Sequence, residues 1–248
     1  MSTVLKKTRS LEDAALHYCP GCSHGVVHRL VGEVIDEMDL REQTIGIAPV
    51  GCSVFLDVYF DFDVIQAAHG RAPAVATGVK RALPDRFVFT YQGDGDLASI
   101  GMGELVHAAA RGERITIIFI NNTNYGMTGG QMAPTTLENQ VTTTTPEGRE
   151  ARLSGYPIRV PELLCSLQGA VYLSRVSVHN PKNINKAKKS IKKAFQVQRD
   201  GLGFSLVEIL SVCPTNWRMN PVQSIQWLEE NMIEVYPLGE LKTVQGVS

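Results

Sequence analysis

Long apolar runs and an excess of charge of one sign are both missing from this sequence of 248 residues. The apolar runs are short, and even Ile115–Ile120 is interrupted by Thr116, whereas a helix that spans a bilayer needs roughly 20 apolar residues. A formal net charge of −1 excludes a general attraction to nucleic acid or to an anionic membrane. The polar, basic stretch Met1–Ser10 is followed by no secretory apolar segment, so we expect a cytoplasmic protein.

Cysteine is scarce, with only 5 residues, and aromatic residues make up 7% of the chain. An odd number of cysteines in a reducing compartment disfavours a framework of disulfides. Such cysteines are more often metal ligands, redox groups or small buried side chains. The hydrophobic share of 44% supports a sizeable core and excludes a disordered chain.

Helical and strand patterns alternate along nearly the whole chain, with no internal repeat, linker or low-complexity tail. This alternation predicts one α/β domain over residues 1–248, with a doubly wound, mostly parallel sheet covered by helices on both faces. Ligands in such sheets bind beyond the carboxyl ends of the strands. The pattern predicts strands at 44–50, 86–91, 115–120, 171–178 and 204–210, and helices at 27–38, 72–83, 97–111, 183–198 and 221–235.

The segment 122–160 breaks this rhythm, because it is rich in Thr, Gly and Pro and has no clear period. Structureless stretches of this length are uncommon inside compact domains and are usually functional. We therefore expect a cofactor or a partner to order it.

An acidic, glycine-rich loop follows the predicted strand 86–91. Its spacing matches the dinucleotide motif G-x-G-x-x-A, but Asp94 and Asp96 would repel a bare pyrophosphate. Mg²⁺ removes the conflict, since it commonly bridges carboxylates to phosphates. The alternative is that both aspartates only cap the following helix.

The next predicted strand, 115–120, ends at Asn121 and Asn122, whose amide oxygens are neutral metal ligands. The strand–helix–strand context places Asp94 and Asn122 at neighbouring strand ends, where both can face one cation. This two-part pattern resembles the signature of thiamine-diphosphate enzymes.

The cysteines offer a second candidate site. Cys19 and Cys22 form a C-x-x-C pair, which alone fits a zinc half-site, a redox pair or an iron–sulfur half-site. Cys52 and Cys213 each follow a predicted strand, and parallel strands end on one side, so the four thiolates can converge. Scattered core cysteines are the alternative, and Cys165 is interpreted as a small buried side chain.

Six motifs follow one another along the chain: HYCPGCSHG (17–25), APVGCSVF (48–55), AHGRA (68–72), YQGDGDLASIGMGE (91–104), INNTNYGMTGGQMAPTT (120–136) and Cys213-Pro214-Thr215. In this order they resemble the β (thiamine-diphosphate-binding) subunit of the 2-oxoacid:ferredoxin oxidoreductases. The VGCSVF form and the chain length are most similar to the branched-chain (2-oxoisovalerate) type.

The resemblance implies three sets of site residues. It implies one [4Fe-4S] cluster on Cys19, Cys22, Cys52 and Cys213, and Mg²⁺ on Asp94, Asn122 and the backbone carbonyl of Asn124. It also implies that thiamine diphosphate is lined by Val50, Gly51, Cys52, Ser53, His69, Gly95, Asp96, Gly126 and Met127, with His69 as a candidate catalytic residue.

Two positions depart from the family pattern or bear on the substrate. Ser23 replaces the glycine of the usual CPGCGH motif. Phe55 stands where members that take 2-oxoglutarate carry a basic residue, so it is a candidate apolar wall of the substrate pocket that would reject a second carboxylate. Simple packing of Phe55 in the core is the alternative.

The implied activity is oxidative decarboxylation of a 2-oxoacid with coenzyme A, with electrons passing through the cluster to ferredoxin. A chain of this length holds one thiamine-binding domain and lacks a ferredoxin-type cysteine run, so the resemblance implies an α subunit together with γ and δ (ferredoxin-like) subunits. Pyruvate and 2-oxoglutarate members, a non-redox thiamine enzyme component and a zinc-stapled nucleotide-binding module stay open. The lysine-rich stretch 182–193 is interpreted as a solvated helix face or a docking surface for an acidic partner.

Overall fold

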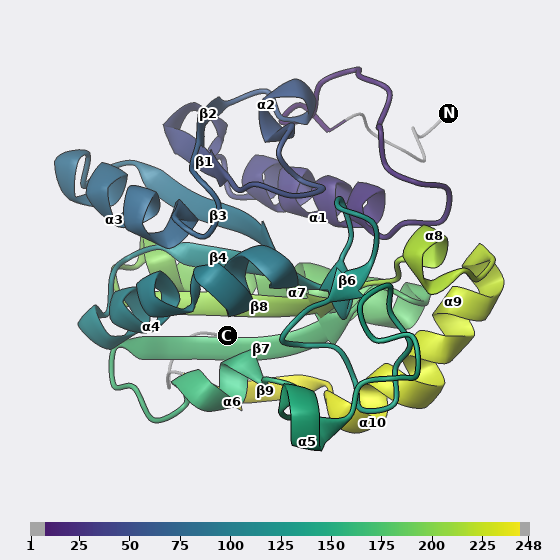
Figure 1. The fold of residues 1–248 in the computed structure, drawn as a ribbon. Helices are drawn as coiled ribbons and strands as arrows, with labels where there is room; N and C mark the ends of the chain where they lie inside the picture. The colour runs from purple at the N-terminus through teal and green to yellow at the C-terminus, as the bar shows by residue number, and fades with distance from the viewer. Residues whose placement is uncertain (1–7, 244–248) are drawn as a thin grey trace.

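The computed structural model describes residues 8–243 and contains a seven-stranded sheet in the order β2-β1-β3-β4-β8-β7-β9 (Figure 1). Every neighbouring pair is parallel except β7 with β9, which is antiparallel. The strands are β1 (Thr44–Ala48), β2 (Asp63–Gln66), β3 (Phe87–Gly93), β4 (Thr116–Asn121), β7 (Ala170–Ser177), β8 (Phe204–Leu210) and β9 (Gly239–Lys242).

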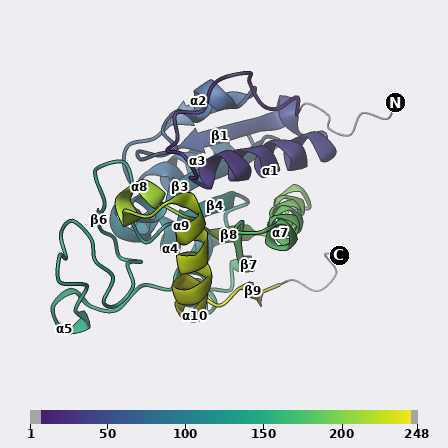
Figure 2. The same cartoon turned by 90° about the vertical axis from the view of Figure 1, so that its right-hand side faces the viewer.

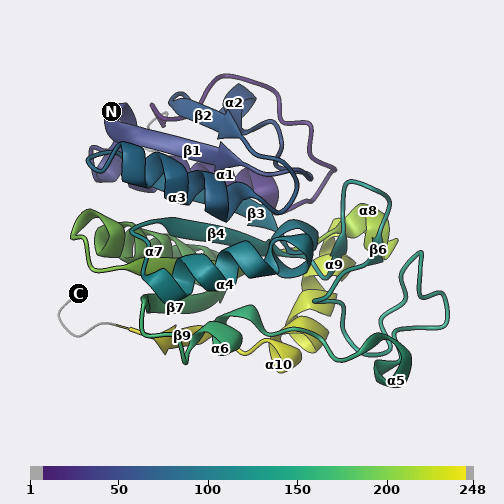
Figure 3. The same cartoon turned by 60° about the vertical axis from the view of Figure 1, so that its left-hand side comes forward.

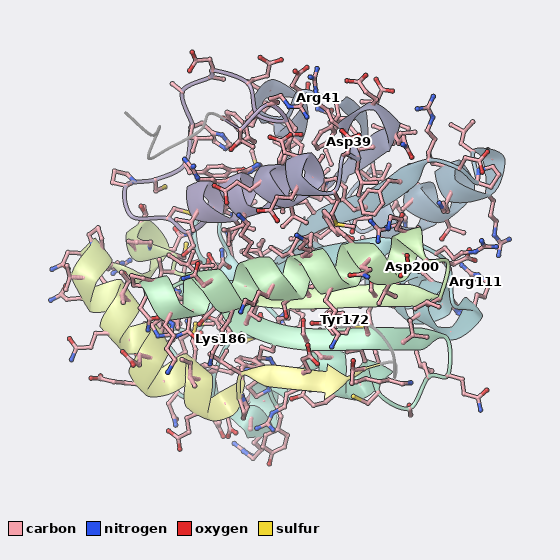
Figure 4. All side chains as sticks on the ribbon, turned by 180° about the vertical axis from the view of Figure 1, so that it is seen from behind. Asp39, Arg41, Arg111, Tyr172, Lys186 and Asp200 are labelled. Atoms are coloured by element: carbon pink, nitrogen blue, oxygen red, sulfur yellow. The ribbon has the colours of Figure 1, made fainter. Side chains whose placement is uncertain are left out.

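Helices cover both faces of the sheet, as the sequence predicts for a doubly wound fold. Figure 3 shows α3 (Ala72–Ala82) and α4 (Met102–Arg111) in front of the strands. From behind, α1 (His24–Glu37) and α7 (Pro181–Arg199) cross the opposite face (Figure 4). The shorter helices and turns are η1 (Arg41–Gln43), α2 (Leu56–Tyr59), η2 (Asp96–Ile100), α5 (Ala151–Ser154), α6 (Val160–Leu164), α8 (Pro214–Trp217), α9 (Pro221–Trp227), η3 (Leu228–Met232) and α10 (Ile233–Val235).

Two apolar layers hold the helices to the sheet. On one face Val27 of α1 and Phe195 of α7 belong to a buried cluster with Phe89 of β3, and on the other Ala76 and Leu105 pack over the same sheet. Central strands such as β4 are buried on both sides, which explains their nearly continuous apolar sequence.

All five predicted strands and all five predicted helices are present; the strand 204–210 has the predicted bounds, and the others have shifted ends. The pattern missed β2 and β9, because these short edge strands carry few buried apolar residues. The predicted helix 97–111 begins with the wide turn η2, in which Ser99 has non-helical dihedrals (φ −108°, ψ −105°). That turn packs against the loop at Gly70, where a Cβ would lie 2.8 Å from the nitrogen of Gly101.

The segment 122–160 contains the short strands β5 (Asn124–Tyr125) and β6 (Gln131–Met132) and is tied together by one buried cation. The Arg149 guanidinium donates to six backbone carbonyls between Ala133 and Tyr156. These contacts lie within the chain, and ordering by a cofactor or a partner stays a prediction.

The C-terminal helices stand in front of the carboxyl ends of the strands (Figure 2). Leu210 at the end of β8, Leu137 and Tyr236 form a third apolar cluster with this layer. The Tyr236 hydroxyl donates to the carbonyl of Thr135 at 2.6 Å. The layer therefore holds the 122–160 segment against this edge of the sheet.

The lysines of α7 include several that pair with acidic side chains of the same chain. Lys188 contacts Glu33 and Glu37, and Lys192 also contacts Glu37. Lys186, labelled in Figure 4, lies on the same helix at the back of the molecule. Docking of an acidic partner stays a hypothesis. No helix within residues 8–243 is long and apolar enough to cross a bilayer.

Candidate functional site

A cavity of about 480 Å³ opens at the carboxyl ends of the central strands. The loops that follow β1, β3 and β4 line it, because these strands are parallel neighbours and end at one edge. The predicted site residues that line the cavity are Val50, Gly51, Cys52, Ser53, His69, Asp94, Gly95, Asp96, Asn122, Asn124, Gly126 and Met127.

Three oxygen atoms face one another in this cavity. The side-chain oxygen of Asn122 lies 3.3 Å from Asp94 Oδ1 and 2.7 Å from the backbone oxygen of Asn124. Oxygens this close repel unless a proton or a cation lies between them. Turning the amide puts its nitrogen there as a donor to both. In the other orientation, the three oxygens form part of the oxygen set that Mg²⁺ prefers, so these residues fit a hard cation.

Burial shapes the chemistry of Asp94. Its side chain accepts hydrogen bonds from the Thr135 hydroxyl at 2.6 Å and from the Gly95 nitrogen at 2.9 Å. Despite these donors, burial raises the pKa of Asp94 to about 7. Across the described residues no cationic side chain is paired with it, and a bound divalent cation would supply the missing positive charge.

A buried ion network beneath the cavity holds the asparagine loop. Arg175 of β7 donates to Glu208 of β8 at 2.6 Å, and Glu208 accepts from the Asn121 amide at 2.7 Å. The oxygen of the same amide accepts from the nitrogen of Thr123, which adopts a left-handed φ of 60°. The network thereby fixes the turn that carries Asn122 and Asn124.

Asp96 differs from Asp94, because donors of this chain already engage both of its oxygens. Oδ1 accepts from the Gly70 nitrogen at 2.8 Å, and Oδ2 accepts from the Gln92 amide at 2.5 Å. His69 also lies 2.8 Å from Oδ1. Asp96 therefore lines the cavity but is occupied as a support for its neighbours.

Glycine is required where the backbone comes closest to other groups. A Cβ on Gly95 would lie 2.3 Å from the ring of Tyr125. A Cβ on Gly126 would lie 3.0 Å from Cys52 Sγ and 3.9 Å from Cys213 Sγ. The two cysteine sulfurs that follow β1 and β8 thus approach the same glycine, beside the oxygen site.

The four cysteines of the predicted cluster lie within electrostatic range of one another. Burial raises the pKa of the Cys22 thiol to about 12, and the other three thiols add to this rise. Burial likewise raises the pKa of Cys52 to about 11. The Asn216 amide donates to Cys213 Sγ at 3.4 Å and to the carbonyl of Gly126 at 2.8 Å.

These thiols fit a shared metal centre, because metal binding replaces the protons that burial otherwise retains. Within residues 8–243, no three His, Cys, Asp or Glu side chains lie close enough together to hold a single metal ion. A four-iron cluster spaces its thiolates more widely, since each binds a different iron.

Ser23, the departure from the family pattern, has a structural role. Its hydroxyl accepts from the nitrogen of Val212 at 3.1 Å and so ties the start of α1 to the chain just before Cys213. The C-x-x-C pair and Cys213 are held together by this bond.

Four predicted site residues lie outside the cavity lining: Cys19, Cys22, Cys213 and Phe55. The Phe55 ring is 43% exposed and meets His17 edge-on, with the ring centroids 5.2 Å apart. It lies at the surface before α2, so a wall formed by Phe55 needs a second surface opposite it. Cys165 is half-buried against the apolar cluster that contains Leu105.

Several supporting residues received no role from the sequence. Thr135 lies 41 residues from Asp94, and Asn216 lies 90 residues from Gly126. His24 lines the cavity and bonds the Tyr91 hydroxyl at 2.9 Å, and burial lowers its pKa to about 3. Thr135, His24 and Gln92 do lie within the quoted motifs 120–136, 17–25 and 91–104, and this is the signal that could have drawn attention to them.

The family model for the thiamine pyrophosphate enzyme, C-terminal TPP binding domain, matches residues 50–209. The chain therefore belongs to this class of thiamine-diphosphate-binding proteins, as its cavity and fold suggest.

Within this class, the similar proteins are 2-oxoacid oxidoreductase subunits. The chain is 50% identical over 245 residues to the ketoisovalerate oxidoreductase subunit VorA of Methanothermobacter thermautotrophicus, with 95% of this chain and 51% of that protein covered. It is 38% identical over 214 residues to the 2-oxoglutarate synthase subunit KorB of Archaeoglobus fulgidus, with 86% and 76% covered. The chain belongs to this family of oxidoreductase subunits, which confirms the resemblance, and it spans about half the length of the VorA relatives.

A solved structure agrees with this placement. The 2-oxoglutarate:ferredoxin oxidoreductase from Magnetococcus marinus, with 2-oxoglutarate, coenzyme A and succinyl-CoA bound, superimposes with a TM-score of 0.80 at 27% identity. The match covers 96% of this chain and 84% of that chain. The doubly wound, thiamine-diphosphate-binding fold is thus confirmed.

Proposed function

We propose that this chain is the thiamine-diphosphate-binding subunit of a 2-oxoacid:ferredoxin oxidoreductase that acts on a branched-chain 2-oxoacid. The reaction would convert the 2-oxoacid and coenzyme A into acyl-CoA and CO₂ and pass two electrons to ferredoxin. The observation that carries the proposal is the meeting of an oxygen-ligand site and a cysteine site at Gly126, where a Cβ would lie 3.0 Å from Cys52 Sγ and 3.4 Å from the Asn122 amide.

We assign a group to each set of residues at this edge as part of the same proposal. Asp94, Asn122 and the Asn124 carbonyl would hold Mg²⁺, and Cys19, Cys22, Cys52 and Cys213 would hold a [4Fe-4S] cluster. When bound, thiamine diphosphate would supply the carbanion chemistry, Mg²⁺ would neutralise the diphosphate, and the cluster would accept single electrons.

Exposed apolar side chains around the cavity support the proposed partners. Val50 and Met127, which line the cavity, are 42% and 53% exposed, and Ile100, which lies against Gly70, is 50% exposed. An apolar rim at a cofactor cavity is typical of a surface that another protein covers. We propose an α subunit that covers this rim and contacts the 122–160 segment of a single domain, with γ and δ (ferredoxin-like) subunits in a cytoplasmic assembly that contacts neither nucleic acid nor membrane.

The substrate proposal depends on the relatives and on Phe55. The VorA relatives favour a branched-chain 2-oxoacid, whereas the KorB relatives favour 2-oxoglutarate. An apolar side chain at position 55 offers no partner to a second carboxylate. A panel of 2-oxoacids, measured for the wild type and for Phe55→Lys, should show branched-chain preference that shifts toward 2-oxoglutarate in the variant. If the wild type converted 2-oxoglutarate faster than branched-chain 2-oxoacids, the substrate proposal would be contradicted.

Anaerobic purification with co-expressed partner subunits tests the function itself. About four iron and one thiamine diphosphate per chain, beyond those of the partners, would support the proposal. Thiamine diphosphate without iron would indicate a non-redox thiamine enzyme component. Zinc without thiamine diphosphate would overturn the proposed function and leave only the fold.

A further inference from the structure

The ring of His69 is held in one protonation form by its neighbours. Its Nδ1 lies 2.8 Å from Asp96 Oδ1 and 3.2 Å from the carbonyl oxygen of Val50. A carboxylate and a carbonyl can only accept hydrogen bonds, so Nδ1 must carry the proton. In the neutral ring the lone pair is then on Nε2, which forms no hydrogen bond with any described residue.

The carboxylate that holds the ring is itself fixed. Asp96 Oδ1 also accepts from the Gly70 nitrogen, and its Oδ2 accepts from Gln92 Nε2 at 2.5 Å. The Thr90 hydroxyl donates to Gln92 Oε1 at 2.8 Å. Thr90, Gln92 and Asp96 are each at most 3% exposed, so a buried chain of bonds runs from β3 to the ring.

His69 also stands in a different part of the cavity from the oxygen site. Its side chain is 38% exposed, whereas Asp94 is 2% exposed. The thiol of a molecule as large as coenzyme A must enter from the open side of the cavity, where the His69 side chain is partly exposed. If the proposed function holds, His69 Nε2 is therefore a proton acceptor at the side of the cavity from which the thiol of coenzyme A would arrive.

We propose that His69 Nε2 accepts the proton of the reacting thiol, and that Asp96 and Gln92 are positioning residues that keep Nδ1 protonated. As the sulfur uses the electron pair of its S–H bond to bind the acyl carbon, the proton would pass to Nε2. The bond between the acyl carbon and the group that carries it would break, and that group would keep the electron pair. The resulting imidazolium is stabilised by Asp96, as carboxylates stabilise imidazolium in other acyl-transfer sites.

The test separates the thiol step from the steps before it in the anaerobically purified complex. His69→Asn keeps an N–H donor near Asp96 and removes Nε2. Because His69 also lines the cavity, the iron and thiamine diphosphate contents of the variant are measured first, and both rates are expressed per bound thiamine diphosphate. We expect the coenzyme A-dependent rate to fall at least about 100-fold more than the rate of cluster bleaching by 2-oxoacid without coenzyme A, the usual size of a general-base contribution.

Two further measurements keep the proposal falsifiable. Asp96→Asn retains an acceptor for Nδ1 but loses the charge, and should lower the thiol-dependent rate at least about tenfold and change its pH profile. In ¹⁵N-histidine NMR of the wild-type complex, the signal lost in His69→Asn should report protonated Nδ1.

The contrary outcomes are distinct. Protonated Nε2 in the neutral ring, an equal loss in the bleaching step, or no loss in the thiol step would each overturn the proposal for His69. A wild-type complex that no 2-oxoacid reduces would instead overturn the proposed function.

Discussion

Two buried carboxylates lie at the carboxyl edge of the same sheet, and they have opposite surroundings. Glu208 is fully buried but accepts from the Arg175 guanidinium and from the Asn121 amide. Arg175 also makes a two-point contact with Glu162. Asp94 is nearly as deeply buried, yet it accepts hydrogen bonds from one hydroxyl and from backbone nitrogens.

The difference in charge pairing between Glu208 and Asp94 indicates different roles for the two carboxylates. Burial lowers the pKa of Arg175 and raises that of Glu208, but the ion pair opposes both effects, so each of these two charges has its partner within the chain. Asp94 keeps an unbalanced charge or an extra proton, because no cationic side chain within residues 8–243 is paired with it. We interpret the first as a support for the asparagine loop and the second as a site prepared for an external cation.

The largest expected effect comes from breaking the complete network. Arg175→Met would leave Glu208 buried without its cation, and we expect a loss of about 3–5 kcal/mol in the free energy of unfolding. Denaturant titration measures it. The matched double variant Arg175→Met/Glu208→Leu should recover part of the loss, and a loss below about 1 kcal/mol would refute the structural role of the pair.

Replacing Asp94, the carboxylate without a cationic partner, should reduce ligand binding and not stability. Asp94→Asn should weaken Mg²⁺-dependent binding of thiamine diphosphate at least tenfold, or about 1.4 kcal/mol, without lowering the stability of the cofactor-free protein. Calorimetry with both ligands checks the first part, with the exposed Asp85→Asn as control. Unchanged affinity would remove Asp94 from the cation site.

The pH dependence of stability sharpens the same contrast. Burial raises the pKa of Asp94 to about 7, whereas an unfolded aspartate titrates near 4. Between these values the folded state binds more protons than the unfolded state, so stability falls as pH rises, by up to roughly 1.4 kcal/mol per pH unit.

With a chelator present, the stability of wild type minus Asp94→Asn should therefore decline from pH 5 to pH 7 and level off above it. Added Mg²⁺ should flatten the slope, because it binds the ionised carboxylate. A difference that is independent of pH would show that Asp94 titrates normally.

The smallest effect is expected at the surface. Lys192 pairs with Glu37 at 2.8 Å, but the two side chains are 48% and 41% exposed. Lys192→Met removes one cation, as Arg175→Met does, yet should cost less than about 1 kcal/mol, with most of that lost in high salt. A larger, salt-independent cost in the same denaturant titration would show that burial is not what distinguishes the two pairs.

Much of the fold was predictable from local patterns. The strand 115–120 and the helix 183–198 were predicted because their apolar periodicity reflects burial directly. The edge strands β2 and β9 were not, because an exposed edge needs no apolar pattern. The wide turn η2 was missed because it depends on contact with Gly70, which lies far away in the sequence.

The sequence by itself determined which residue types follow each strand, and hence that carboxylate, amide and thiol groups gather at one edge. Parallel strands end together, so order along the chain was enough for Asp94, Asn122 and Cys52 to line one cavity. Only the tertiary structure decided the hydrogen bonds, burial and protonation of these groups. Thr135 and Arg175 reach the site from distant segments, and the position of Asp96 sets the protonated nitrogen of His69, because hydrogen bonding and desolvation depend on distances in space.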